Sequence, residues 1–237
     1  MNLNKLHKPV THYRHRATRV GEPGQFFLHS ARSCDRQRLE QYIGERYNQA
    51  HQANVTRFMP VLLEMTIRDK TAAAIGLTPG RIRPMFLEQY LEKPIEQQIS
   101  AIAKLPIDRH RVIETGNLAV TRRGAGLLLF MILASSVARA GYQWMVFTAT
   151  DEVKRLINAL GIQLHYLTDA RPERLESGSG DWGTYYQNNP QVMVGNLLEA
   201  VTAIQDSPAL SAILNVHQSE IAALANSLDD FRRHQSE

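Results

Sequence analysis

One stretch of the chain, VIETGNLAVTRRGAG at residues 112–126, gathers side chains that could do chemistry. Its first part, Val112–Val120, has the composition of a β-strand and carries a single carboxylate, Glu114. Arg122 and Arg123 follow, then a Gly-Ala-Gly sequence, and then the most apolar helical segment of the chain. A strand, a basic glycine turn and a helix start in this order predict a binding site for an anion.

The backbone of the turn gives that site its physical basis. Amides at the start of a helix lack intrahelical partners and lie at the positive end of the helix dipole. Gly124 and Gly126 would let a ligand approach the backbone, and the two arginines suit phosphate. The turn lacks the Gly-Lys-Ser/Thr of a nucleotide P-loop and the three glycines of a dinucleotide fingerprint, so we set those two classes aside.

The elements that must position this turn alternate between strands and helices, which predicts a mixed α/β fold of the α+β class. In chain order we predict helix 36–54, an antiparallel hairpin of strands 55–67 and 72–77, two short helices within 85–104, strand 112–120, helix 127–140, strand 142–150, a helix from residue 151, strand 163–170, a glycine-rich loop at 176–190, and a strand or helix at 191–204. Pro60 interrupts the first hairpin strand, which favours an edge or a bulge. If strands 112–120 and 142–150 are parallel neighbours that splay apart, they open a cleft for an extended ligand.

The last segment has a heptad pattern that can be interpreted in two ways. Its apolar positions recur at alternating spacings of four and three. These positions are Leu210, Leu214, His217, Ile221, Leu224, Leu228 and Phe231. They predict a terminal helix that either docks on its own domain or pairs subunits in a homodimer.

Composition limits the class of protein. The 237 residues include 27 basic and 23 acidic side chains, a net charge of +4, which is too small to imply nucleic acid. The single cysteine, Cys34, excludes an intramolecular disulfide framework, and the nine histidines show no metal-ligand spacing. With neither a secretory leader nor an apolar stretch long enough to span a membrane, we expect a cytoplasmic protein.

The division into regions follows from the same patterns. Basic residues crowd the first twenty positions, which predicts a solvated, poorly ordered tail, with contact to an anionic surface as the alternative. We expect a basic N-terminal segment at 1–34, one catalytic domain at 35–205, and a C-terminal amphipathic helix at 206–237.

Several stretches resemble the thermostable hemolysin family, whose members are similar to the GNAT superfamily of N-acetyltransferases. The matching sequences are YIGERYNQAHQANVTRFMPVLLEM (42–65), AAAIGL (72–77), FLEQYLEKPIEQQIS (86–100), ETGNLAV (114–120), VFTAT (146–150) and WGTYYQNNPQVMVGN (182–196). The resemblance implies a GNAT-like central sheet, mixed but mostly antiparallel and twisted, flanked by helices, with the C-terminal helix added.

The resemblance also implies how the central stretch works. In the GNAT superfamily this strand binds the acyl-thioester arm and the turn holds pyrophosphate. Here Leu118, Ala119 and Val120 would therefore pair with pantetheine. The phosphates would be held by Arg122, Arg123, Gly124, Ala125 and Gly126. The ETGNLAV sequence is also similar to a strand of acyl-homoserine-lactone synthases, which makes Glu114 the candidate base for an amine nucleophile.

Two positions depart from the superfamily pattern. The turn usually begins with Gln or Arg, and Thr121 stands at the aligned position. The tyrosine that often acts as general acid on a later helix aligns near Ile157. Either Tyr185 or Tyr186 protonates the leaving thiolate instead, or the protein does not run this chemistry.

Other candidates have a structural interpretation beside the functional one. Glu114 could be an exposed carboxylate on an edge strand or a partner of Arg111, and Asn117 could orient substrate or stabilise a bulge. Arg57 could bind a carboxylate or phosphate of the substrate, or only keep its charge in water. The aromatic side chains of the glycine-rich loop suit a lid over an acyl chain or ordinary packing. These aromatic residues are Trp182, Tyr185 and Tyr186.

These observations predict an N-acyltransferase without a metal. An acyl-CoA or acyl carrier protein thioester would lie in the cleft, its carbonyl polarised by a strand amide near residues 118–120, and an amine deprotonated through Glu114 would attack it. The competing classes are a membrane-active hemolysin without enzymatic activity and a degenerate acyl-CoA-binding module. Lysis through an amphiphilic acylated product would reconcile the family name with an enzyme.

Overall fold

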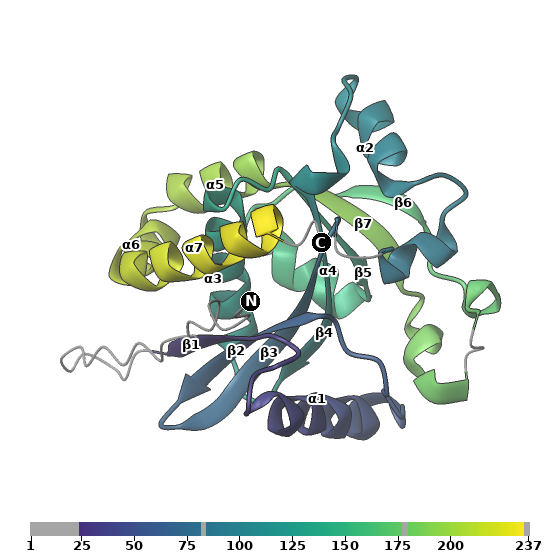
Figure 1. The fold of residues 1–237 in the computed structure, drawn as a ribbon, viewed down its shortest axis with the longest axis horizontal. Coiled ribbons are helices and arrows are strands. Elements are labelled where there is room, and N and C mark those ends of the chain that lie inside the picture. The colour runs from purple at the N-terminus through teal and green to yellow at the C-terminus, as the bar shows by residue number, and fades with distance from the viewer. Residues whose placement is uncertain (1–23, 82–83, 177–179, 235–237) are drawn as a thin grey trace, which may run out of the picture.

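The computed structural model describes residues 24–81, 84–176 and 180–234 of the chain (Figure 1). The strands in this part are β1 (Gln25–His29), β2 (Val61–Ile67), β3 (Lys70–Pro79), β4 (Val112–Val120), β5 (Trp144–Ala149), β6 (His165–Asp169) and β7 (Gln191–Asn196). The α-helices are α1 (Arg36–His51), α2 (Ile95–Ala103), α3 (Ala125–Arg139), α4 (Asp151–Asn158), α5 (Leu197–Asp206), α6 (Pro208–Val216) and α7 (Gln218–His234).

The strands form one mixed sheet in the order β1-β2-β3-β4-β5-β7-β6. Every neighbouring pair is antiparallel except β4 and β5, which are parallel. The parallel pair needs a crossover connection, and the apolar helix α3 supplies it. The predicted mixed, mostly antiparallel sheet is confirmed, and the basic turn lies at its one parallel junction.

The predicted hairpin of β2 and β3 is confirmed by its turn. Ile67 pairs with Lys70, and the two turn residues, Arg68 and Asp69, have φ angles of 54° and 58°. Two successive positive φ angles are typical of the tight turns whose twist matches that of the joined strands. The first hairpin strand is shorter than predicted, because segment 55–60 forms no ladder with β3 and β2 begins after Pro60.

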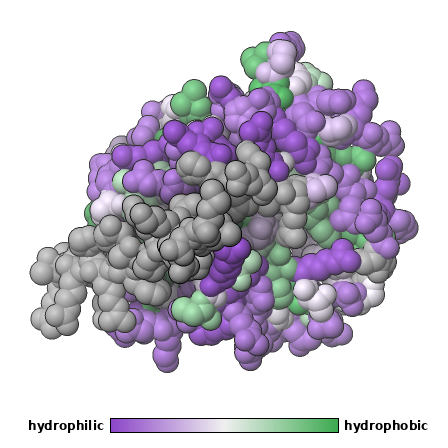
Figure 2. All heavy atoms as spheres, in the orientation of Figure 1, coloured by the Kyte–Doolittle hydropathy of each residue, from purple (hydrophilic) through white to green (hydrophobic). Residues whose placement is uncertain are grey.

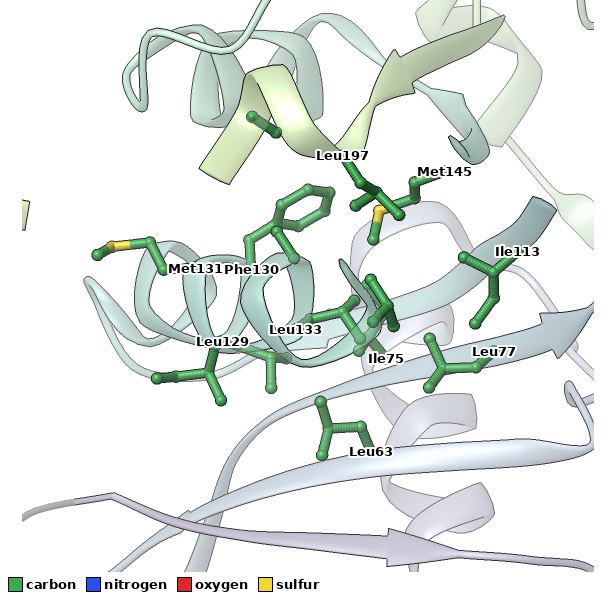
Figure 3. Close-up of a cluster of buried hydrophobic side chains, with 14 of the residues drawn as sticks. Leu63, Ile75, Leu77, Ile113, Leu129, Phe130, Met131, Leu133, Met145 and Leu197 are labelled. Carbon is green, nitrogen blue, oxygen red and sulfur yellow. The ribbon is translucent and has the colours of Figure 1, made fainter. Parts of the chain in front are cut away.

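Helices cover both faces of the sheet (Figure 1). Side chains of α3 pack against β2 and β3, and α3 in turn contacts α5 and α7. Figure 3 shows Leu129 and Leu133 of α3 in this core, with Leu63 and Ile75 from the strands. The opposite face buries Leu62 in a cluster with residues of α1, as the alternation of side chains along a strand requires.

The C-terminal heptad pattern docks on the chain's own core. Leu214, Ile221, Leu224 and Leu228 are buried, and α7 packs against α3 and β1. The prediction of a single terminal helix is wrong, because α6 ends at Val216 and α7 begins at Gln218. Buried apolar positions continue across the break. The seam is therefore not a free surface for pairing subunits.

The N-terminal segment 1–34 is only partly described. Its residues 25–29 form β1, which pairs with β2, so this segment adds an edge strand to the sheet. The basic residues of the first twenty positions say nothing of this strand, which lies after them. The predicted tail at positions 1–20 lies outside the described residues.

The described surface bears on the membrane-active alternative. No helix among residues 24–81, 84–176 and 180–234 is long and apolar enough to cross a membrane. On the face shown in Figure 2, outside the area that grey atoms occupy, hydrophilic residues predominate and apolar ones are scattered. Exposed large apolar side chains include Leu105, Tyr166 on β6 and Leu198 on α5, and two of them, Ile213 and Val216, lie three residues apart on α6.

Candidate active site

The two parallel strands β4 and β5 separate at the middle of β4. Their pairing runs from Val112 opposite Trp144 to Thr115 opposite Phe147 and stops there. Strand β4 nevertheless continues to Val120, so its second half diverges from β5. A cavity of about 1640 Å³ is lined by residues of both diverging strands, the turn after β4 and the start of α3. A cleft is thus present where the two strands diverge, as predicted.

A β-bulge lies at the point of divergence. The register between β3 and β4 shifts by one residue between the pairs Ala74–Ala119 and Gly76–Gly116. Within the bulge Asn117 has a φ angle of 49°, a left-handed conformation that asparagine tolerates better than most residues. Bulges free backbone groups from the ladder, and this one frees them at the cavity wall.

The side chain of Asn117 bonds the segment that precedes β2. It is buried, and its Oδ1 accepts a hydrogen bond of 3.0 Å from the backbone N–H of Met59. Its Nδ2 contacts the carbonyl of Arg57 at 3.5 Å. These contacts fasten segment 55–60 to β4, so the stabilising role weighed for Asn117 has direct geometric support.

The turn after β4 borders the cavity and leads into α3. Gly124 has a φ angle of 82° and precedes α3 as its N-cap, where glycine adopts the left-handed conformation without steric cost. Arg122 and Arg123 are exposed, and both line the cavity with Gly124 and Gly126.

Two residues of this turn differ from the others. Ala125 is buried in the main core and its amide donates to the carbonyl of Arg122 at 3.0 Å, so it does not line the cavity. Thr121, at the unusual position, donates through Oγ1 to the carbonyl of Ala72 at 3.2 Å and accepts from the Tyr42 hydroxyl at 3.2 Å. Threonine thus ties the turn to β3 and α1.

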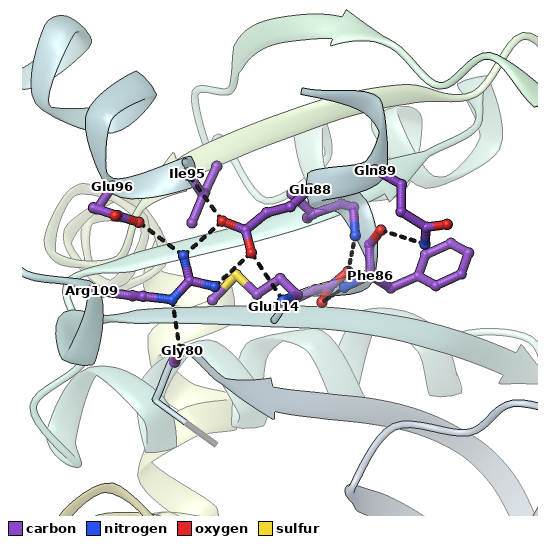
Figure 4. Close-up of polar contacts among 10 residues, drawn as sticks. Gly80, Phe86, Glu88, Gln89, Ile95, Glu96, Arg109 and Glu114 are labelled. Carbon is purple, nitrogen blue, oxygen red and sulfur yellow. Dashed lines mark hydrogen bonds and ion pairs between the residues drawn. The ribbon is translucent and has the colours of Figure 1, made fainter. Parts of the chain in front are cut away.

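Glu114 lies in the wall of the cavity, on the central strand β4. It is only 2% exposed, so the interpretation as an exposed edge-strand carboxylate is wrong. Its two oxygens accept hydrogen bonds from the backbone amides of Phe86 at 2.8 Å and Leu87 at 2.9 Å (Figure 4).

The segment that caps Glu114 is itself held by an ion-pair cluster. Arg109 donates to both oxygens of Glu88 at 2.6 Å, to Glu96 at 2.9 Å and to the carbonyl of Gly80 at 2.8 Å (Figure 4). Burial raises the pKa of Glu88, but the bonds from Arg109 and from backbone amides lower it to a greater total extent. The cluster fixes the two amides that Glu114 accepts.

Aromatic side chains of the glycine-rich loop form another part of the wall. The Trp182 ring lies 5.3 Å from that of Tyr185, which in turn lies 5.3 Å from the rings of Tyr186 and His51. The Tyr186 hydroxyl lies 2.5 Å from the hydroxyl of Tyr90. Burial raises the pKa of both Tyr185 and Tyr186, so both phenols stay protonated at neutral pH.

The backbone fastens this loop to the end of α1. The amide of Thr184 donates to the carbonyl of His51 at 2.8 Å, and the amide of Asn54 donates to the backbone carbonyl of Asp181 at 2.7 Å. Gly183 lies so close to the His51 carbonyl that a Cβ at this position would clash with it. The described part of this loop is therefore packed against the end of α1.

The remaining predicted residues fall in two places. Arg57 is exposed at the cavity edge, in the irregular segment before β2 rather than on a strand. Ile157 is fully buried in the core, so α4 supplies no phenol at that position. Among the described residues, no group of three or more His, Cys, Asp or Glu side chains could hold a metal ion.

Sequence reasoning missed the contribution of α1 to the cavity. Tyr47 and His51 stand four residues apart on one face of this helix, and both line the cavity. Their spacing is visible in the sequence, but an aromatic pair at that spacing is equally typical of a helix packed on a sheet. Burial lowers the pKa of His51, while nearby Glu152 raises it to a smaller extent.

Comparison with known proteins places the chain in a sequence family. The model of the family described as thermostable hemolysin matches residues 29–201. No curated protein matches the chain.

Three solved structures share its fold at low sequence identity. The AHL synthase LasI is 9% identical with a TM-score of 0.51, over 75% of this chain and 91% of that one. The CoA-dependent acyl-homoserine lactone synthase BjaI, solved with SAM and isopentyl-CoA, is 14% identical with a TM-score of 0.51, over 78% and 89%. FeeM, an N-acyl amino acid synthase from uncultured soil microbes, is 9% identical with a TM-score of 0.50, over 80% and 98%. The fold is GNAT-like.

Proposed function

The chain belongs to the thermostable hemolysin family, and we propose that it is an N-acyltransferase that moves an acyl group from a thioester to an amine. The observation that carries the proposal is the cavity at the split between β4 and β5, which joins a bulged strand, a basic helix start and a buried carboxylate. The solved proteins of the same fold, a CoA-dependent synthase among them, support an acyl thioester as donor.

The donor would lie along the second half of β4. Backbone groups of residues 118–120, which β5 leaves unpaired, would bond the pantetheine amides. Arg122 and Arg123, with the amides before α3, would bind the phosphates. The same arginines would suit an acidic acyl carrier protein, because opposite charge steers association. Both proposed donors are cytoplasmic thioesters, so a cytoplasmic location is part of the proposal.

The acceptor amine would approach Glu114 from the aromatic side of the cavity. Glu114 would accept the amine proton, directly or through a water, as the nitrogen attacks the thioester carbon. Trp182 and Tyr186 would contact the acyl chain or the acceptor, Arg57 would bind an anionic group of the substrate, and Tyr185 would donate a hydrogen bond to the leaving sulfur. Asn117 would contribute by holding the bulge.

Thermal denaturation with CoA, acetyl-CoA and a long-chain acyl-CoA tests donor binding. A ligand that binds only the folded state stabilises it by roughly 2.7 kcal/mol at a hundredfold excess over its Kd. We expect the shift to disappear in Arg123→Glu and to persist in Arg32→Glu, a charge reversal at an exposed position outside the cavity. No shift with any thioester would exclude CoA as donor and leave acyl carrier protein to be tested.

Thiol release then tests the reaction. Each acyl-CoA that binds is mixed with a panel of amines that includes amino acids and S-adenosylmethionine, and free CoA is followed with a thiol reagent. Acceptor-dependent release supports the transferase. Binding without release from any pair, with acyl carrier protein also tested, would favour an acyl-CoA-binding module, and haemolysis that survives Glu114→Gln would favour a membrane-active protein.

A further inference from the structure

Tyr47 is a cavity residue to which the proposed mechanism assigns no role. It extends from α1, which packs against β4, and its ring lies 6.3 Å from the rings of both Trp182 and Tyr185. It lines the same cavity as Glu114 and the turn after β4. Ring contacts on one side and the strand on the other hold the phenol in a defined position.

The hydroxyl of Tyr47 meets the backbone of the bulge. Burial raises the pKa of Tyr47, and a hydrogen bond from the backbone amide of Leu118 lowers it to a smaller extent. Leu118 lies between the register pairs of Gly116 and Ala119, where the bulge breaks the ladder between β3 and β4. Tyr47 and Leu118 both line the cavity, so the amide that the bulge frees lies beside this phenol, which stays protonated at neutral pH.

With the Leu118 amide beside the phenol, the Tyr47 hydroxyl is the group that can polarise the carbonyl of a thioester. A phenol that accepts one hydrogen bond still has its own proton to donate, and accepting a bond strengthens its donation. Preorganised donors of this kind stabilise the negative charge that develops on a carbonyl oxygen during acyl transfer.

Three other tyrosines near the cavity have hydroxyl partners of their own. Tyr186 and Tyr90 bond each other through their hydroxyls. Tyr42, also on α1, donates to Thr121 at the start of the turn.

We infer that the Tyr47 hydroxyl is the oxyanion donor of the acyl transfer, relaying the Leu118 amide to the carbonyl oxygen of the bound thioester. The inference rests on the proposed function and names the group that stabilises its intermediate. It replaces direct donation by a strand amide with donation through the phenol.

The step balances without any further reactant. The amine nitrogen forms a bond to the thioester carbon, its proton passes to Glu114, and the carbonyl π electrons move to the oxygen, which the Tyr47 O–H bonds. Collapse of this intermediate re-forms the carbonyl and breaks the carbon–sulfur bond. The sulfur leaves with the electron pair and takes up the proton that Glu114 accepted, passed on through a water, which regenerates the carboxylate. The Tyr47 proton stays on its phenol throughout.

Tyr47→Phe tests this role because it keeps the ring contacts and removes only the hydroxyl. The probes are a long-chain acyl-CoA as donor and hydroxylamine as a small amine that is already neutral at neutral pH, with the uncatalysed reaction subtracted. We expect kcat to fall by about 10²–10³-fold, as on removal of an oxyanion-hole donor, with KM for the acyl-CoA unchanged. The thermal shift produced by acyl-CoA should also be unchanged, because the phosphates bind elsewhere.

Two further variants make the result decisive. Tyr166→Phe removes the hydroxyl of an exposed tyrosine on β6 outside the cavity, and it should keep full activity. Tyr185→Phe removes the hydroxyl of a neighbouring ring, and its loss should be smaller than that of Tyr47→Phe. Full kcat in Tyr47→Phe, or a loss confined to KM, would overturn the inference while leaving the transferase intact. A wild-type protein without acyl transfer to any amine would overturn the proposed function itself.

Discussion

Two buried glutamates of the same sheet show how one residue type serves two purposes. Glu64 on β2 is 1% exposed and Glu114 on β4 is 2% exposed. Glu64 bonds side chains: the guanidinium of Arg38 at 2.8 and 2.9 Å, the ring of His29 at 3.0 Å, and the hydroxyl of Thr71. Glu114 accepts backbone amides and lines the cavity, whereas Glu64 does not.

The difference lies in what surrounds each carboxylate. Burial raises the pKa of Glu64, but its bonds to His29, Arg38 and Thr71 together lower it to about 2. A carboxylate held ionised in this way fastens α1 and β1 to the sheet and is a poor base. A carboxylate held by the backbone at a cavity wall can face a ligand. Burial alone therefore does not identify a catalytic glutamate.

The largest expected effect is on catalysis at Glu114. Glu114→Gln keeps the size of the side chain and removes its ability to accept a proton. We expect kcat to fall by about 10²–10⁴-fold with an amine acceptor that is protonated at neutral pH, as for loss of a general base. Steady-state thiol release measures it. Hydroxylamine needs no deprotonation before attack, so a much smaller loss with this acceptor would identify the base.

A comparable loss of kcat with both acceptors would contradict the proposed difference between Glu114 and Glu64. Glu114 would then only hold the 85–90 segment, in the way that Glu64 holds α1. The midpoint of thermal unfolding of Glu114→Gln provides the control, because loss of an accepted amide bond costs on the order of 1–3 kcal/mol whether or not Glu114 is the base.

The second effect is on stability at Glu64. Its pKa falls from the ordinary value of 4.5 to about 2, which corresponds to about 3 kcal/mol of folding free energy at neutral pH. This is an upper value, because the Arg38 side chain is 51% exposed and solvent screens the pair. We expect Glu64→Gln to lower the free energy of unfolding by up to this amount in urea titrations. The kcat of the folded fraction should stay at the wild-type value.

The pH dependence of that stability has a definite sign. Because the folded pKa is depressed, the unfolded chain binds the proton at higher pH than the native state does. The stabilisation by Glu64 is therefore complete above pH 4.5 and is lost as the pH falls from 4.5 towards 2. Glu64→Gln should flatten this part of the stability curve, and an unchanged curve would show that other carboxylates govern acid unfolding.

The sequence predicts the surroundings of Glu114 better than its role. The strand 112–120 and the glycine turn before α3 are predicted correctly, because composition and turn residues act locally. The sequence alone leaves two interpretations of Asn117, of which the bulge is one. Its φ angle of 49° accompanies contacts with segment 55–60, which is distant in sequence. Tyr47 escapes prediction for the same reason, because only folding brings α1 to the amide of Leu118.

The partners of Glu64 likewise cannot be predicted from the sequence. The run VLLEM predicts part of a strand, and nothing in it shows that Arg38, His29 and Thr71 converge on its carboxylate. Three elements separated in the chain supply those partners. Sequence periodicity fixes which face of a strand is buried, but it does not reveal which buried charges are paired.

The smallest expected effect is the loss of stability in Gly124→Ala. This variant tests whether donor binding depends on the conformation of the glycine turn. Gly124 has a φ angle of 82°, and a Cβ added there would meet no atom within 4 Å, so Gly124→Ala introduces backbone strain without a clash. A left-handed conformation costs an alanine about 1–2 kcal/mol, and we expect a loss of stability of this size. Gly180→Ala is the matched control, because its Cβ would also meet no atom and no positive φ applies there. If alanine at 124 relaxes the turn, the acyl-CoA-induced thermal shift should shrink as well, whereas a stability loss with full donor binding would show that the amides before α3 tolerate rearrangement.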